Sequence, residues 1–177
     1  MRKIALCTLL AVLLVPASAA AHSYINPFAS PVWQPSRTDM GMDWVPTRKA
    51  PVLAIGDAVI LGAENHASWP GHHLIWYRLL NGSHAGYVVY VAEHLKHLAR
   101  VGQRVHAGQR IAIALPGYPW TEWGWADAGG SPRAYPCYKE GKQTNSGRQM
   151  ARFLISLGAA TGDPPGRGAD RPKGRKC

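Results

Sequence analysis

The chain has 177 residues and a formal net charge of +10 at pH 7, from 20 lysines and arginines against 10 aspartates and glutamates. This length suits one domain. The 46% hydrophobic content is enough for a buried core, which excludes wholesale disorder. After residue 21, no stretch approaches the ~18 consecutive apolar residues typical of a membrane-spanning helix.

The N-terminus has the pattern of an export signal. Arg2 and Lys3 precede an apolar run over residues 4–15, and small residues at 17–21 offer a cleavage site. The apolar run is too short to span a membrane. We therefore expect a signal peptide over 1–21 and a mature protein that is secreted or periplasmic and soluble.

Two cysteines remain after the signal is removed, Cys137 and Cys177. An exported chain enters an oxidising compartment, where these two could form a disulfide. Cys177 lies in the expected flexible tail, so pairing would need only sufficient reach, and a free or intermolecular thiol is the alternative.

Short β-type runs separated by glycine turns dominate the middle of the chain. Runs 52–55 and 58–61 flank a Gly-Asp pair, and runs 74–80 and 86–92 flank an Asn-Gly pair. Both patterns predict β-hairpins. Many short strands with glycine turns are typical of an all-β sandwich or barrel.

One helix is predicted near the C-terminus. Met150, Phe153, Leu154 and Leu157 have the i, i+3, i+4, i+7 spacing of a buried helix face, and Gly158 would end the helix.

These patterns divide the mature chain into three parts. We expect an extended lead-in over 22–36, one domain over 37–160, and a disordered basic tail over 161–177. The tail could contact an anionic cell-wall polymer. We expect no nucleic-acid partner, because the protein is exported and the tail lacks interleaved aromatic residues.

Acidic residues are scarce, so their positions are informative. Asp39 and Asp43 lie on either side of a Met-Gly-Met segment, where strand geometry would turn both toward one face. Glu93 follows an apolar run, and Glu122 lies among three tryptophans.

The order of these segments resembles the lysostaphin-like zinc peptidases, secreted enzymes that cut peptidoglycan. The resemblance rests on 39–43, the Ala-Pro-Val-Leu-Ala segment at 50–54, the segment 90–95, the two Gly-Gln steps in 101–111, and the Glu-Trp-Gly-Trp segment at 122–125. It implies an all-β barrel-sandwich hybrid with one C-terminal helix.

The resemblance also implies that the zinc site is altered. In this family, zinc is held by a first histidine, an aspartate, and the second histidine of a closing His-x-His pair. Asp39 and Asp43 take the first two places, and the closing pair aligns with Glu122 and Gly124. A glycine has no side chain to bind zinc, so the resemblance implies loss of zinc proteolysis.

A further family histidine, in a Tyr-x-His-Leu strand, acts on the substrate. Spacing from the Gly-Gln steps puts Glu93 at this place, and a one-residue slip puts His94 there. Tyr90 belongs to the same strand. The first histidine of the closing pair also acts on the substrate in this family, and Glu122 takes its place. The resemblance therefore makes Glu93, His94 and Glu122 the candidate catalytic residues.

If the fold is of this type, Asp39, Asp43, Glu93 and Glu122 would converge on one groove. Clustered carboxylates repel, so at least one must be protonated, paired with a cation or bound to a metal. Zn²⁺, or an oxygen-preferring ion such as Ca²⁺ or Mn²⁺, could be held by Asp39, Asp43 and Glu122. Two carboxylates could instead act as acid and base on a glycosidic bond. The remaining alternatives are ligand binding without chemistry, or ordinary roles in which Asp39 caps a turn and Glu93 pairs with an arginine.

Two tryptophans have two interpretations. Trp123 and Trp125 would share one strand face, with Glu122 and Gly124 on the other. An aromatic face beside a carboxylate suits a sugar ligand, with Asp39, Asp43 and Tyr90 as further contacts. Alternatively, both rings belong to the core.

The leading hypothesis is an exported, peptidase-like domain that has lost its zinc site and binds peptidoglycan or another cell-wall glycan, with no required cofactor. The alternative is an active cell-wall hydrolase, either metal-dependent with altered ligands or based on Glu93 and Glu122 as an acid and base pair.

Overall fold

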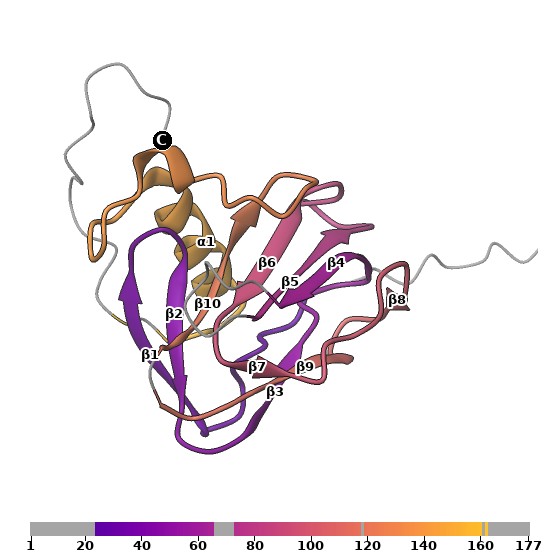
Figure 1. Cartoon of the computed structure of the whole chain (residues 1–177), viewed down its shortest axis with the longest axis horizontal. Coiled ribbons are helices and arrows are strands. Elements are labelled where there is room, and N and C mark those ends of the chain that lie inside the picture. The colour runs from indigo at the N-terminus through magenta and orange to yellow at the C-terminus, as the bar shows by residue number, and fades with distance from the viewer. Residues whose placement is uncertain (1–23, 66–72, 118, 161, 163–177) are drawn as a thin grey trace, which may run out of the picture.

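A computed structural model describes residues 24–65, 73–117, 119–160 and 162 (Figure 1). The expected signal peptide, and the expected tail apart from residue 162, lie outside these residues. Within the described part of the chain, no helix has the length and apolar character needed to cross a membrane.

The described residues form ten strands, one 3-10 helix and one α-helix. In chain order they are β1 (Trp33–Thr38), β2 (Met42–Pro46), β3 (Ala50–Leu53), β4 (Ala58–Asn65), β5 (His73–Leu79), β6 (Val88–Ala92), β7 (Leu95–Lys96), β8 (Arg104–Val105), β9 (Arg110–Ala114), β10 (Thr121–Ala126), η1 (Tyr135–Cys137) and α1 (Asn145–Ser156).

The strands pair into two antiparallel sheets. The larger sheet has the order β1-β2-β10-β6-β5-β4-β8, and the smaller has the order β3-β9-β7. Helix α1 packs against β10, β2 and β1 (Figure 1). The predicted all-β fold with one C-terminal helix is confirmed.

The two faces of the large sheet carry different side chains. In β10, Trp123 and Trp125 point into the main core, while Glu122 and Gly124 point to the opposite face. A smaller apolar cluster, which includes Tyr90, covers that opposite face. The alternation predicted for β10 is therefore confirmed.

One of the two predicted hairpins is correct. β5 pairs with β6 in antiparallel fashion, and the Asn-Gly pair lies in the connection between them. The prediction for 52–55 and 58–61 is wrong, because β3 pairs with β9 while β4 pairs with β5 and β8. The chain crosses from the small sheet to the large one between Leu53 and Ala58, where Ala54 exchanges backbone hydrogen bonds with the turn at 108–109.

The predicted helix is confirmed. Its N-terminus is capped by Thr144, whose hydroxyl accepts a hydrogen bond from the Gly147 amide at 3.0 Å. Met150 and Leu154 are fully buried. Gly158 ends the helical path with a φ of +88°, a conformation that favours glycine.

Residues 24–36, the described part of the segment expected as a lead-in, belong to the folded domain. Strand β1 begins at Trp33, and the Phe28 ring stacks on the Trp44 ring with a centroid separation of 3.7 Å. Phe28 also meets Trp123 edge to face. The Phe28 ring is buried between two core tryptophans, so the core begins before residue 37.

Replacing Phe28 by alanine tests this role. We expect the variant to lose roughly 3–5 kcal/mol of unfolding free energy, as a large-to-small change in a core does. Urea unfolding followed by tryptophan fluorescence measures the loss. The control is Val101→Ala, at a side chain that is 62% exposed, and a change within about 0.5 kcal/mol is expected there. If Phe28→Ala were as neutral as the control, Phe28 would not belong to the core.

Candidate functional site

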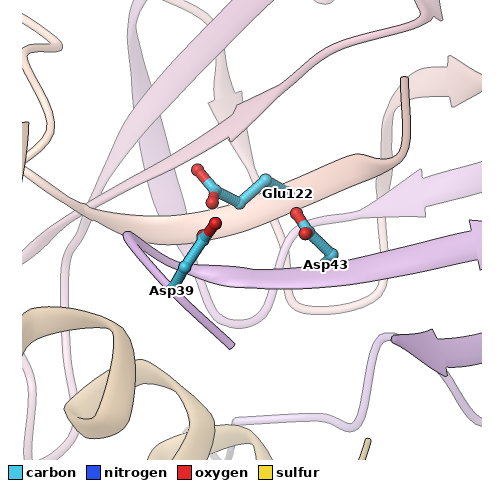
Figure 2. Close-up of side chains that lie close together, drawn as sticks. All are labelled: Asp39, Asp43 and Glu122. Carbon is cyan, nitrogen blue, oxygen red and sulfur yellow. The ribbon is translucent and has the colours of Figure 1, made fainter. Parts of the chain in front are cut away.

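Three acidic side chains meet on the face of the large sheet that lies away from the main core. Asp43 on β2 is directly opposite Glu122 on β10, so the two side chains lie on the same face. Asp39 comes from the turn between β1 and β2. Figure 2 shows the three carboxyl groups pointing toward one another. We call Asp39, Asp43 and Glu122 the acidic triad.

A glycine in the turn allows this approach. A Cβ atom on Gly41 would lie 2.3 Å from the Trp123 carbonyl oxygen and 2.9 Å from Cγ of Glu122. The Gly41 amide donates a hydrogen bond to Oε2 of Glu122 at 3.1 Å. A side chain at position 41 would therefore push the turn away from β10 and separate Asp39 from Glu122.

The acidic triad is tight and buried. One oxygen from each carboxyl group lies within 4.8 Å of the others, a separation that allows the three to hold a metal ion. The residues are only 1%, 4% and 4% exposed for Asp39, Asp43 and Glu122. Three negative charges in such a site repel strongly, so protons or a cation must offset them.

Arg37 on β1 supplies a positive charge to the site. Its Nε lies 2.8 Å from Oδ2 of Asp43 and 3.3 Å from Oδ2 of Asp39. Its Nη2 lies 2.8 Å from Oε1 of Glu140. Burial opposes the arginine charge, but Glu140 and the two aspartates outweigh it and raise the pKa of Arg37. The guanidinium is therefore permanently charged.

Other donors from the chain bind carboxyl oxygens of Glu122 and Asp39. The Tyr90 hydroxyl donates to Oε1 of Glu122. The Gly141 amide donates to Oδ2 of Asp39 at 3.2 Å. The backbone carbonyl of Asp39 accepts hydrogen bonds from the amide and the hydroxyl of Thr144, at 2.9 and 2.8 Å. The start of α1 thus fixes the turn that carries Asp39.

The environment of the triad favours protonated carboxyl groups. Burial, followed by the charge of Asp39, raises the pKa of Asp43 to about 7, although Arg37 opposes the shift. Burial and the two neighbouring aspartates raise the pKa of Glu122 well above its ordinary value. Burial and the charge of Glu122 likewise raise the pKa of Tyr90, so its hydroxyl remains a donor.

Gly124, expected at the second place of the closing pair, lies away from the acidic triad. Gly124 is opposite Tyr90 and away from Asp43, and a Cβ on Gly124 would lie 2.3 Å from Cε1 of Tyr90. This glycine makes room for the tyrosine ring that reaches Glu122. Glu122, and not Gly124, completes the set with Asp39 and Asp43.

Glu93 and His94 are not part of the triad. Glu122 is opposite Ala92, the last residue of β6. Glu93 and His94 follow with φ values of +71° and +50°, so the chain turns away from the strand at this point. Among the described residues, the acidic side chains close enough together to hold a metal ion are Asp39, Asp43 and Glu122, without Glu93. Nδ1 of His94 is buried without a hydrogen-bond partner among the described residues. The acidic triad thus contains three of the four acids expected to converge, and Glu93 lies outside it.

The sugar-stacking interpretation of the tryptophans is wrong. Trp123 and Trp125 are 0% and 2% exposed and lie in the main core, so a ligand in solvent cannot reach their faces. Tyr90 is also fully buried, and its hydroxyl is engaged with Glu122. The alternative interpretation, in which both tryptophans are core residues, is the correct one.

Cys137 is disulfide-bonded in the structure. The other two cysteines, Cys7 and Cys177, lie outside the described residues, so pairing with Cys177 stays a prediction.

Sequence reasoning missed three residues of the site: Arg37, Trp120 and Glu140. Cζ of Arg37 lies 5.2 Å from the centroid of the Trp120 ring, a cation–π distance. The sequence contained one indication that a basic residue belongs to the site, because clustered acidic side chains need a cation or protons to offset their charge. It did not indicate which arginine supplies it.

The residues present do not fit a catalytic zinc ion. Such a site uses mostly histidine ligands and keeps one position open for water. The acidic triad has no histidine, is closed to solvent, and already receives hydrogen bonds from Arg37, Gly41 and Tyr90. The distances between the carboxyl oxygens would admit a metal ion. However, the three carboxyl groups already have hydrogen-bond partners, and the Arg37 guanidinium supplies a positive charge beside them.

The raised pKa of Asp43 predicts a pH-dependent stability in the presence of a chelator. The folded value of about 7 exceeds the model-peptide value of 3.8, so folding tightens the hold on this proton. Its contribution is complete below pH ~4 and is lost as the pH rises through 7, with a slope of up to about 1.4 kcal/mol per pH unit. Urea unfolding between pH 4 and 8 measures the slope. Asp43→Asn should flatten it, and an equal slope in the variant would contradict the assignment.

The hydrogen bond from Tyr90 to Glu122 predicts a second effect. Tyr90→Phe keeps the ring but leaves the buried carboxyl group with one donor fewer, which should cost about 1–3 kcal/mol of unfolding free energy. The matched control is Tyr77→Phe, at another fully buried tyrosine, whose hydroxyl makes only a long 3.4 Å contact with the Ile55 amide. Equal losses in both variants would show that the Glu122 contact contributes nothing specific.

Comparison with known proteins gives a likeness of fold. Among solved structures, the chain is similar to lysostaphin, known from an NMR solution structure, with a TM-score of 0.50 and 20% sequence identity. The match covers 87% of this chain and 61% of the lysostaphin chain. No protein-family model matches the chain, and no curated protein matches its sequence. The fold is therefore lysostaphin-like.

Proposed function

We propose that this chain is an exported domain that binds cell-wall peptidoglycan, or a related wall glycan, without cleaving it. The observation that carries the proposal is the closed acidic triad. The place expected for a catalytic metal holds three buried carboxyl groups that are hydrogen-bonded within the chain. Hydrolysis by a metal requires an open coordination position for water, which this arrangement does not provide.

Two features support the cell wall as the binding partner. The fold resembles that of lysostaphin over most of the chain. In addition, three of the ten acidic residues are buried in the triad, so the surface carries even fewer negative charges than the composition suggests. Excess positive surface charge attracts anionic polymers over long range, in a salt-sensitive way.

Accessible residues beside the triad could contact the ligand. Arg37 is 29% exposed and lies over the Trp120 ring, and both Trp120 and Tyr138 are half-buried. An aromatic ring next to an arginine offers one apolar surface and several hydrogen-bond donors to a sugar or a peptide. The proposed contact surface is therefore Arg37, Trp120 and Tyr138, above the buried triad and not within it.

The first test combines sedimentation with fragment analysis. The mature protein is incubated with purified peptidoglycan, with and without Zn²⁺, Mn²⁺ or Ca²⁺, and released fragments are analysed by mass spectrometry. We expect protein in the pellet and no fragments. New amino ends would indicate a peptidase, and new sugar ends a glycan hydrolase, which Glu93→Gln and Glu122→Gln should then inactivate. If the protein were not retained on peptidoglycan and no fragments were released, a wall-directed function would be contradicted.

The second test removes one side chain of the proposed surface. Trp120→Ala should weaken retention on peptidoglycan about 2- to 10-fold, the range expected for losing one aromatic contact of ~0.5–1.5 kcal/mol. The matched control is Tyr87→Ala, at a 41% exposed ring beyond the opposite end of β10. Equal retention by both variants would place the ligand elsewhere. Circular dichroism checks that both variants are folded.

A further inference from the structure

We propose that the guanidinium of Arg37 is the resident cation of the acidic triad, and that the protein therefore takes up no divalent metal ion there. This inference concerns the charge balance of the site and holds whichever wall ligand is bound.

The contacts of Arg37 match those of a bridging cation. Its Nε lies 2.8 Å from an oxygen of Asp43 and 3.3 Å from an oxygen of Asp39, while Nη2 reaches Glu140 at 2.8 Å. One guanidinium thus joins two carboxyl groups of the triad, those of Asp39 and Asp43, to Glu140, while Glu122 receives hydrogen bonds from Gly41 and Tyr90. The two aspartate side chains are buried, so their contacts with the guanidinium are little screened by water, whereas the Glu140 side chain is 65% exposed and its contact contributes less.

Arginine suits this role better than lysine would. Its planar guanidinium carries five N–H donors in a fixed geometry and remains charged at all physiological pH values. The neighbouring Trp120 ring, at 5.2 Å, favours a cation over its face. Arg37 therefore supplies a permanent charge that needs neither uptake nor exchange with solvent.

The segment between η1 and α1 holds the guanidinium in place. Glu140 binds Arg37 on the solvent side and accepts a hydrogen bond from the Tyr138 hydroxyl at 3.1 Å. The next amide, of Gly141, donates to Asp39 at 3.2 Å. An incoming ion would have to break these contacts and expel Arg37, because two cations sharing the same aspartate oxygens would repel each other.

The first measurement is the metal content of the full-length mature protein. Samples are dialysed against Zn²⁺, Mn²⁺ or Ca²⁺, passed through a desalting column and analysed by inductively coupled plasma mass spectrometry. We expect well below one ion per chain and the same Tm with metal as with a chelator. One ion per chain with a raised Tm, both lost in Asp43→Asn, would overturn the proposal.

The second measurement removes the resident cation. Arg37→Met keeps the length and apolar stem of the side chain but leaves the triad without its counter-charge. We expect this variant to have a lower Tm than the wild type, to bind one Mn²⁺ or Ca²⁺ per chain, and to gain several degrees in Tm with the metal. The double variant Arg37→Met with Asp43→Asn should lose the metal response.

A matched arginine controls for general effects of losing a charge. Arg133 also lies over an aromatic ring, that of Tyr87 at 4.9 Å, and has no acidic triad beside it. Arg133→Met should show no metal response. If Arg37→Met gained no ion, or gained no more than Arg133→Met, the guanidinium would not be the substitute for a metal. If Arg37→Met failed to fold, Arg37→Gln removes the same charge while keeping a polar side chain, and the same gain of one ion per chain is expected.

Discussion

The repulsion among three buried carboxyl groups is the constraint on which the site depends. Asp39, Asp43 and Glu122 lie close together because strand pairing places two of them opposite each other and a glycine turn brings in the third. Such a cluster is unstable unless protons or a cation compensate it. Arg37 and the protons retained by Asp43 and Glu122 provide that compensation. The surrounding segments then close over a site whose charge is balanced internally.

Because the charges of this site are balanced within the chain, the likeness of fold does not imply the chemistry of a metal-dependent enzyme. The likeness to lysostaphin concerns the arrangement of strands, and one fold can hold sites with very different chemistry. A catalytic zinc site needs an open position for water, whereas carboxyl groups that are paired with a guanidinium can be closed to solvent. The same sheet face can therefore act as a rigid floor for binding. The proposed ligand contacts then lie above this floor, at Arg37 and Trp120.

Much of the fold was predictable because it follows local patterns. The spacing of Met150 and Leu154 identified α1, and alternation in β10 separated Glu122 from the tryptophans. The failed hairpin shows the limit, since two runs around a Gly-Asp pair have the same local signal whether they pair together or enter different sheets. In the site, Asp39, Asp43 and Glu122 could be predicted because acidic residues are scarce in this chain and because these three lie in segments whose order resembles a known family. Arg37 could not be predicted, because nothing local marks one arginine among many as a long-range partner.

The central claim is that a side chain of the protein occupies the place of a metal ion. The most direct test is a crystal structure from crystals soaked in Mn²⁺, with anomalous diffraction data. The account predicts guanidinium density bridging Asp39, Asp43 and Glu140, with no anomalous peak among the three carboxyl groups of the triad. A manganese peak bound by Asp39, Asp43 and Glu122, with Arg37 turned out to solvent, would contradict it.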